Sequence, residues 1–123
     1  MNVLVDTHII LWWLNEDEKL TPEHRNIISA TDNICFISAA SIWEISIKQK
    51  LGKLEIPADY LVEVKREGFQ ELLVSWNHCS QVSKLPLIHN DPFDRLLIAQ
   101  SMLENLTLLS VDNKIKLYKV SVI

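Results

Sequence analysis

Short apolar runs alternate with amphipathic segments along the whole chain. Continuous apolar runs are typical of parallel strands covered on both faces, whereas apolar residues three or four positions apart are typical of helices packed on a sheet. The runs predict strands over residues 2–6, 33–37, 69–75, 106–111 and 118–122. The segments between them predict helices over 7–14, 22–30, 38–51, 58–67, 77–84 and 91–105, with a turn or short helix over 112–117.

Residues that begin and end helices fall where this pattern places the helix ends. Thr21 and Asp91 each precede a proline, an order typical of an N-cap and the first helical residue. Gly52 and Gly68 follow two predicted helices and suit their C-terminal ends. Strands alternating with helices predict right-handed crossovers. We therefore expect a single domain over residues 1–123, with a three-layer α/β/α fold around a central parallel sheet of about five strands.

Composition narrows the class of protein. Hydrophobic residues make up 48% of the chain and charged residues 23%, which is typical of a globular domain that needs no disulfide or structural metal to fold. The longest apolar runs are far shorter than the about 20 residues of a membrane-spanning helix, and no signal peptide is visible, so we expect no membrane association. Cys35 and Cys79 lie in apolar segments without metal-site spacing, and we expect both to be buried free thiols of a cytoplasmic protein.

Four acidic residues fall near the carboxyl ends of predicted strands, where open parallel sheets bind their ligands. Asp6 ends the first strand, and Asp112 follows the fourth. Glu44 lies early in the helix after the second strand, and Asp94 lies in the first turn of the helix before the fourth. We therefore expect four carboxylates from four separate elements to point toward one end of the sheet.

Each acid also has a purely structural interpretation. Ser41 and Glu44 have the spacing of a capping box, and Asp94 is placed to serve a helix dipole or cap. Asp6 and Asp112 are at positions typical of turn residues. Glu44 is the most informative, because it shares a helix face with three apolar residues that we expect to pack on the sheet: Ala40, Ile47 and Leu51. A carboxylate on such a face is costly unless it is paired or binds a metal.

Four carboxylates held close together repel one another unless cations neutralise them. Mg²⁺ and Mn²⁺ prefer such oxygen ligands, and two ions about 3.5–4 Å apart can activate a water and stabilise the leaving oxygen in phosphodiester cleavage. The net charge of −4 argues against a protein that mainly coats nucleic acid, but it permits an enzyme that acts on nucleic acid through bound metal. Two groups of lysines either contact a phosphate backbone or form solvated faces: Lys48, Lys50 and Lys53, and Lys114, Lys116 and Lys119.

The acids lie in segments that resemble a known family. These are Val-Leu-Val-Asp6-Thr7-His8, Ser41-Ile-Trp-Glu44-Ile, Asp91-Pro-Phe-Asp94-Arg95-Leu-Leu-Ile-Ala99 and Leu-Leu-Ser110-Val-Asp112. Together, in this order and over essentially the whole chain, they resemble the PIN-domain nucleases, and specifically the VapC-type toxin ribonucleases of toxin–antitoxin pairs. No single segment is specific, but the ordered set is.

The resemblance implies an endoribonuclease that hydrolyses RNA with water activated by Mg²⁺ or Mn²⁺. It assigns both the catalytic and the metal-binding role to the quartet Asp6, Glu44, Asp94 and Asp112. It further implies a cognate antitoxin that covers the site, and a homodimer. The alternative is a catalytically silent RNA-binding or protein-interaction module on the same fold.

Other residues are expected to support the quartet or to contact substrate. By the resemblance, Thr7 and Ser110 orient ligands or water, and Ser41 belongs to the same group. Asp91 either caps its helix or lies near the metals. Arg95 either contacts a phosphate or, as we favour, forms an ion pair that holds the geometry of the quartet.

Histidines and tryptophans near these segments have weaker assignments. We expect His8 to be a polar residue at a helix start, and His89, on the loop before Asp91, is a candidate for substrate contact. Trp43 is expected in the core, with base stacking as the alternative. At least one of Trp12 and Trp13 is expected in the core.

Two other families with acids at strand ends fit less well. A phosphorelay receiver domain requires an acid at the end of its third strand, where this chain has Ser75 and Trp76. A haloacid-dehalogenase-like phosphatase begins Asp-x-Asp, and here His8 replaces the second acid.

Overall fold

The computed structural model describes residues 1–123 and contains four strands, six α-helices and one 3₁₀ helix. The strands are β1 (Asn2–Val5), β2 (Ile34–Ser38), β3 (Gln70–Leu72) and β4 (Thr107–Leu109). The helices are α1 (Thr7–Leu14), α2 (Pro22–Ser29), α3 (Ala39–Lys50), α4 (Tyr60–Arg66), α5 (Trp76–Val82), α6 (Pro92–Glu104) and the 3₁₀ helix η1 (Ile115–Leu117). No helix is long and apolar enough to cross a membrane.

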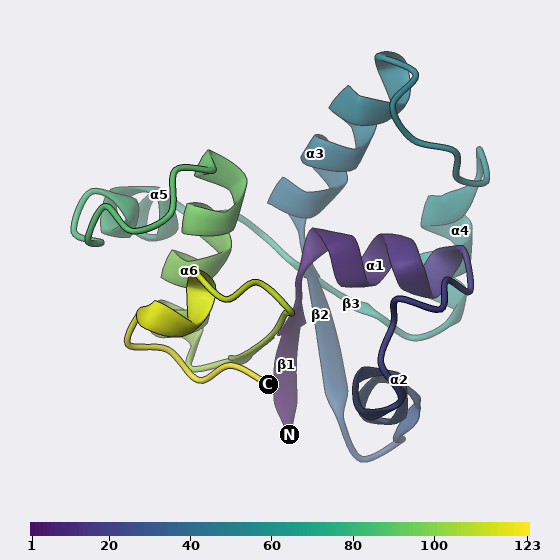
Figure 1. The fold of residues 1–123 in the computed structure, drawn as a ribbon, viewed down its shortest axis with the longest axis horizontal. Coiled ribbons are helices and arrows are strands. Elements are labelled where there is room, and N and C mark those ends of the chain that lie inside the picture. Colours follow the sequence, from purple (N-terminus) through teal and green to yellow (C-terminus); the bar gives the residue numbers. More distant parts are fainter.

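The strands form one parallel sheet in the order β3-β2-β1-β4. The central position of β1 explains its continuous apolar sequence. Val3 and Val5 belong to one core cluster and Leu4 to the other, and all three are fully buried. Figure 1 shows α1, α2 and α4 on one side of the sheet and α5 and α6 on the other, which confirms the three-layer α/β/α fold.

Residues 118–122, predicted as a fifth strand, form only one bridge to the sheet. This segment pairs with β4 only at an isolated parallel bridge between Leu108 and Val122. Pairing is short because β4 has only three residues and the chain reaches it directly after η1.

Helix boundaries agree closely with the sequence signals. The Thr21 hydroxyl accepts a hydrogen bond from the backbone of His24, and the Asp91 carboxylate caps α6 in the same way. Gly52 and Gly68 follow α3 and α4 with φ of +71° and +90°, a region that favours glycine.

Three predictions of burial are wrong or only half right. The second half of α3 leaves the sheet, as Figure 1 shows, so Ile47 and Leu51 are exposed instead of packed on it. Trp43, on the same helix, is 63% exposed. Cys35 is buried but Cys79 is exposed. Trp12 and Trp13 are partly buried against the core.

Candidate active site

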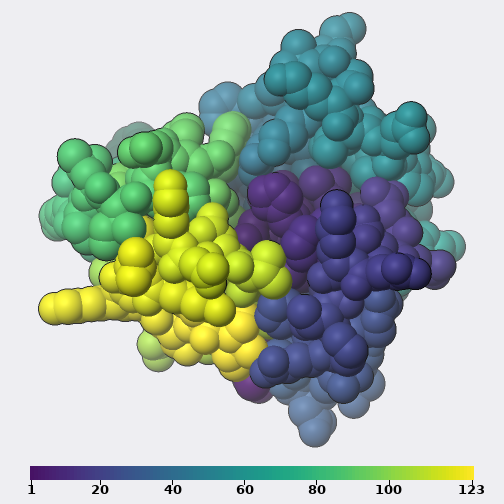
Figure 2. All heavy atoms as spheres, viewed as in Figure 1, coloured from purple at the N-terminus to yellow at the C-terminus, as the bar shows by residue number.

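Asp6 is fixed where β1 passes into α1. Its backbone N–H donates to the Leu109 carbonyl of β4, and its carboxylate accepts hydrogen bonds from the backbone N–H of His8 (3.3 Å) and the Ser110 hydroxyl (2.6 Å). Asp6 is 2% exposed. In Figure 2 the N-terminal segment, in purple, lies between the green and yellow C-terminal third and the blue-to-teal atoms of α3 and its following loop. This is the end of the sheet at which the sequence predicts the acids.

Ser110 joins the acids that follow β1 and β4. Its hydroxyl donates to Asp6 and accepts from the backbone N–H of Asp112 at 3.1 Å. Partial burial opposes ionisation of Asp112, but hydrogen bonds from His89 and from the backbone N–H groups of Lys114 and Ile115 outweigh it. The pKa of Asp112 is therefore lowered. The ionised form of Asp112 is thus stabilised by hydrogen-bond donors.

His89 lies between Asp112 and Asp94. Its Nε2 is 2.7 Å from Asp112 Oδ2 and 3.1 Å from Asp94 Oδ2. Burial, together with the negative charges of Asp6, Asp91 and Glu44, raises the pKa of Asp94 to about 7, although His89 opposes the shift. The carboxylates of Asp6, Glu44 and Asp94 are therefore close enough for their negative charges to repel one another.

Glu44 has an unpaired buried oxygen. The residue is 5% exposed, Oε2 accepts from Lys48 Nζ at 2.9 Å, and Oε1 has no hydrogen-bond partner. The capping-box interpretation is wrong, because Ser38 caps α3 and the Ser41 hydroxyl accepts instead from Thr7 at 3.0 Å. A buried carboxylate oxygen without a donor is costly, and a cation would satisfy it. This atom and the all-oxygen quartet fit Mg²⁺ or Mn²⁺.

Asp91 acts as the N-cap of α6. Its Oδ1 accepts from the backbone N–H groups of Phe93 (2.8 Å) and Asp94 (3.2 Å). Its charge also lies near enough to Asp94 to raise the pKa of that residue. One side chain therefore serves the helix and adds to the negative field of the site.

The ion pair that we favoured for Arg95 is not formed. Arg95 is 9% exposed and forms no ion pair. Its guanidinium donates to the Tyr118 hydroxyl and to four backbone carbonyls, those of Val82, Leu85, Pro86 and His89, at 2.9–3.4 Å. Arg95 therefore holds the loop that carries His89.

His8, which is exposed, and Lys48, which is partly exposed, are basic groups beside the acids. The Asp6 carboxylate, 3.9 Å from His8 Nδ1, is the main reason that the pKa of His8 is raised. Trp43 meets Phe93 edge-on, with ring centroids 5.4 Å apart. Trp43 is exposed and Phe93 is half-buried, and they precede Glu44 and Asp94 in sequence by one residue each.

The sequence matches the PIN domain family model over residues 3–121. The chain belongs to the PIN domain family. It is thereby a member of a family of nucleases, which supports phosphodiester hydrolysis. No protein of curated function matches the sequence.

Solved structures share the fold of this PIN domain. VapBC2 from Rickettsia felis, solved with a DNA fragment from its promoter, has a TM-score of 0.75 and 15% identity, covering 100% of this chain and 98% of that chain. FitAcB from Neisseria gonorrhoeae has a TM-score of 0.59 and 17% identity over 98% and 95%. A domain of a functionally unknown protein from Methanocaldococcus jannaschii has a TM-score of 0.58 and 14% identity over 99% and 89%. At these identities the likeness shows the fold alone.

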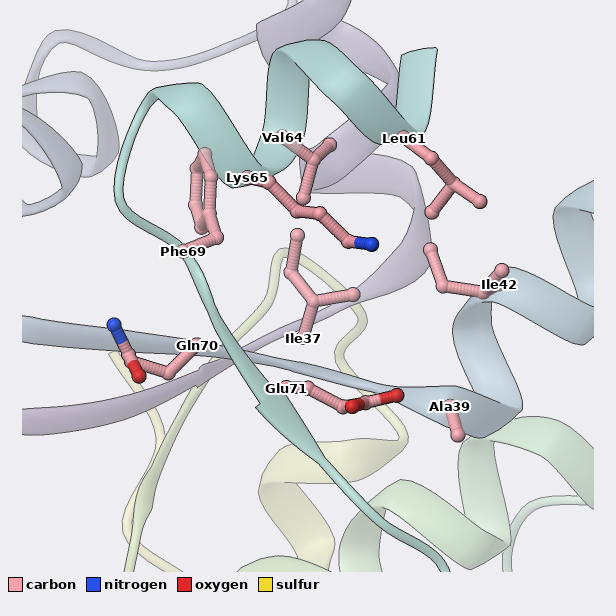
Figure 3. Close-up of a pocket in the computed structure, with 9 residues that line it drawn as sticks. All are labelled: Ile37, Ala39, Ile42, Leu61, Val64, Lys65, Phe69, Gln70 and Glu71. Atoms are coloured by element: carbon pink, nitrogen blue, oxygen red, sulfur yellow. The ribbon is translucent and has the colours of Figure 1, made fainter. Parts of the chain in front are cut away.

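A second hollow lies away from the acids. It is an open groove between α3, α4 and the edge strand β3, and Figure 3 shows Ile37, Ile42, Leu61, Val64 and Phe69 facing it, with Lys65 and Glu71 also at its wall. Its volume is about 240 Å³. The mainly apolar lining is unsuited to a metal, and none of the four acids lines the groove.

Proposed function

We propose that this PIN domain is a metal-dependent endoribonuclease that acts as the toxin of a cytoplasmic toxin–antitoxin pair. The observation that carries the proposal is the convergence of four carboxylates, from four elements, at one end of the sheet. The unpaired Glu44 Oε1 and the raised pKa of Asp94 are both signs of negative charge that lacks a neutralising partner.

Each residue of the site has a distinct part in the proposed reaction. Asp6, Glu44 and Asp94 would hold Mg²⁺ or Mn²⁺, with Asp112 as a further ligand, direct or through water. The bound ion would lower the pKa of a water nucleophile and stabilise negative charge on the phosphate. The Ser110 hydroxyl, which donates to Asp6, orients that carboxylate. The hydrogen bond between Thr7 and Ser41 joins the starts of α1 and α3 below the acids.

RNA is the proposed substrate because of the aromatic pair beside the acids. Single-stranded RNA is commonly recognised by stacking of its bases on aromatic side chains. Trp43 precedes Glu44 on α3, is 63% exposed and contacts Phe93, so its ring would be offered to a base of the bound RNA. Lys48, which is partly exposed, adds positive charge on the same side.

The groove of Figure 3 is the surface that we propose for the antitoxin. The resemblance to VapC-type toxins implies a protein partner, and the groove offers apolar side chains from α3 and α4 that the chain leaves uncovered. Leu61 is 42% exposed there. A homodimer is part of the same proposal, and the strongly exposed Leu73 and Trp76 provide apolar surface for it.

The test is cleavage of total cellular RNA by purified protein with Mg²⁺, with Mn²⁺ or with EDTA, beside the variant Asp6→Asn. We expect discrete fragments only with metal and none from the variant. If RNA remains intact while the wild type binds RNA and no metal, the silent-module alternative replaces the proposal. Single-stranded DNA of the same sequence as a cleaved RNA tests the choice of nucleic acid.

A further inference from the structure

The imidazole of His89 has both ring nitrogens engaged. Nε2 faces the carboxylates of Asp112 (2.7 Å) and Asp94 (3.1 Å). Nδ1 lies 3.1 Å from the backbone nitrogen of Asp91, which donates to it. A backbone N–H can only donate, so Nδ1 must carry a lone pair and no proton. The ring proton is therefore on Nε2, because the hydrogen bond at one ring nitrogen fixes the state of the other.

This tautomer conflicts with a metal role for the ring. Ligand atoms of His89, Asp94 and Asp112 all lie within 4.8 Å of one another, a spacing that by itself suggests a mixed nitrogen and oxygen metal site. A protonated Nε2, however, has no lone pair for a metal. To bind one, the ring would have to move its proton to Nδ1, which would then face the N–H of Asp91, donor against donor.

We propose that His89 is a positioning residue whose Nε2–H donates to Asp112 and lies 3.1 Å from the Asp94 carboxylate, holding the two carboxylates together so that oxygen atoms alone bind the cation. The inference rests on the proposed function, because it concerns the same site. An all-oxygen site is selective for hard cations such as Mg²⁺ and Mn²⁺, whereas an imidazole ligand would favour softer ions such as Zn²⁺.

The backbone around His89 is built to hold the ring in place. The N–H groups of Ile88 and His89 both donate to the Tyr118 hydroxyl, at 3.2 and 2.8 Å, and that hydroxyl donates to the Pro86 carbonyl at 2.9 Å. Arg95 donates to the His89 carbonyl and to Tyr118. His89 itself is 9% exposed. Hydrogen bonds with Tyr118, Arg95 and Asp91 thus hold the loop and the ring in place. A flip of the ring would break the contact with Asp91.

The first measurement is nitrogen-15 NMR of the metal-free wild type, which reports the protonated ring nitrogen of each histidine. His89 is assigned from its loss in His89→Gln. We expect the Nε2–H form, and an Nδ1–H form would overturn the proposal. This experiment needs no metal and no RNA, so its result is independent of whether the proposed nuclease activity is correct.

The second measurement is pulsed EPR of the protein loaded with Mn²⁺, which detects nitrogen bonded directly to the ion. We expect no such coupling from His89. A coupling that disappears in His89→Gln would make His89 a ligand and overturn the proposal. A coupling that disappears only in His8→Ala would leave the proposal standing.

Conservative replacement separates positioning from packing. The Gln side chain keeps an N–H donor, whereas Ala removes it. We expect Mn²⁺ affinity by calorimetry to fall about 10- to 100-fold in His89→Ala, as for other partners of metal ligands, and to be largely restored in His89→Gln. Equal losses in two folded variants, checked by circular dichroism, would contradict a donor role.

Discussion

The two sides of the acidic site are built differently. On the side of α6 and β4, Asp94 and Asp112 are bridged by His89, and backbone N–H groups donate to Asp91 and Asp112. On the side of α3, Glu44 has a single partner, the partly exposed Lys48, and its other oxygen is buried without one. On the first side, His89 and backbone N–H groups hold the carboxylates in place. On the second side, only the flexible side chain of Lys48 does so.

This contrast shows how a site can be rigid and still attract a cation. In the proposed site, the hydrogen-bonded side would fix the positions of the carboxylates, and the unsatisfied charge on the other side would supply the free energy of cation binding. The predictions that follow disturb one side at a time.

Asp94→Asn should have the largest effect, because it removes a proposed ligand from the rigid side. Cleavage should fall by more than the about 10- to 100-fold typical of an outer partner. The free energy of unfolding, in contrast, should be higher in Asp94→Asn than in the wild type at pH 8. Since the pKa of Asp94 is about 7 instead of 3.8, the folded state binds more protons than the unfolded state between these values. The free energy of unfolding of the metal-free wild type should therefore fall as pH rises from about 4 to 7.

The measurement is urea unfolding in EDTA at pH 5 and pH 8. The contribution of Asp94 should be a few kcal/mol, since one pKa unit corresponds to about 1.4 kcal/mol. Asp94→Asn should lose this pH dependence and be more stable than the wild type at pH 8, whereas the exposed control Asp32→Asn should follow the wild type. A variant less stable at pH 8 would contradict the assignment.

Arg95→Lys tests the scaffold behind the rigid side. A lysine cannot reach the four carbonyls and the hydroxyl that the guanidinium joins, so several buried acceptors lose their donor. The free energy of unfolding should fall by about 3 kcal/mol. Arg66→Lys, on an exposed ion pair with Glu63, is the matched control and should change it by less than about 0.5 kcal/mol. A similar loss in both variants would mean that Arg95 does not organise the loop.

Local sequence signals predicted the fold and the positions of the acids, but not the side-chain contacts. The β1 run, the caps Thr21 and Asp91, and Gly52 and Gly68 each act on neighbouring residues, so a sequence pattern records them. Acids at strand ends converge because a parallel sheet brings those ends together.

The failures involve distant partners. Arg95 donates to backbone carbonyls of a loop. Every residue has such a carbonyl, so the sequence does not show which ones accept. Helical periodicity groups Ile47 and Leu51 on one face of the helix. It cannot show that α3 extends past the sheet that would cover this face. The sequence indicates His89 only as a candidate substrate contact, since nothing in it places the His89 loop between Asp94 and Asp112.

Trp43→Ala tests the exposed rim on the α3 side. If a base stacks on this ring, affinity for RNA should fall by about 1–3 kcal/mol, and Trp43→Phe should retain most of it. Binding is measured by fluorescence anisotropy in the Asp6→Asn background, so that the RNA is not cut. Leu103→Ala is the control, because Leu103 is 45% exposed at the C-terminal end of α6, whereas Asp94 lies in the first turn of that helix. A change of oligomeric state on sedimentation with unchanged RNA affinity would instead place Trp43 at a protein interface.

Lys48→Met should have the smallest effect on the free energy of unfolding, and this effect should be seen only without metal. In EDTA the variant leaves Glu44 without its cation, but Lys48 is 34% exposed and the pair is partly screened, so the loss should be about 1 kcal/mol or less. With saturating Mg²⁺ the loss should disappear, because the ion replaces the ammonium group beside the carboxylate. Calorimetry should show Mg²⁺ binding severalfold more tightly than in the wild type, since no lysine competes for Glu44.

Lys50→Met, at the exposed end of the same helix, is the control and should change neither the free energy of unfolding nor the Mg²⁺ affinity. Weaker Mg²⁺ binding in Lys48→Met would mean that Lys48 orients Glu44 for the ion, and the α3 side would then be as preorganised as the other.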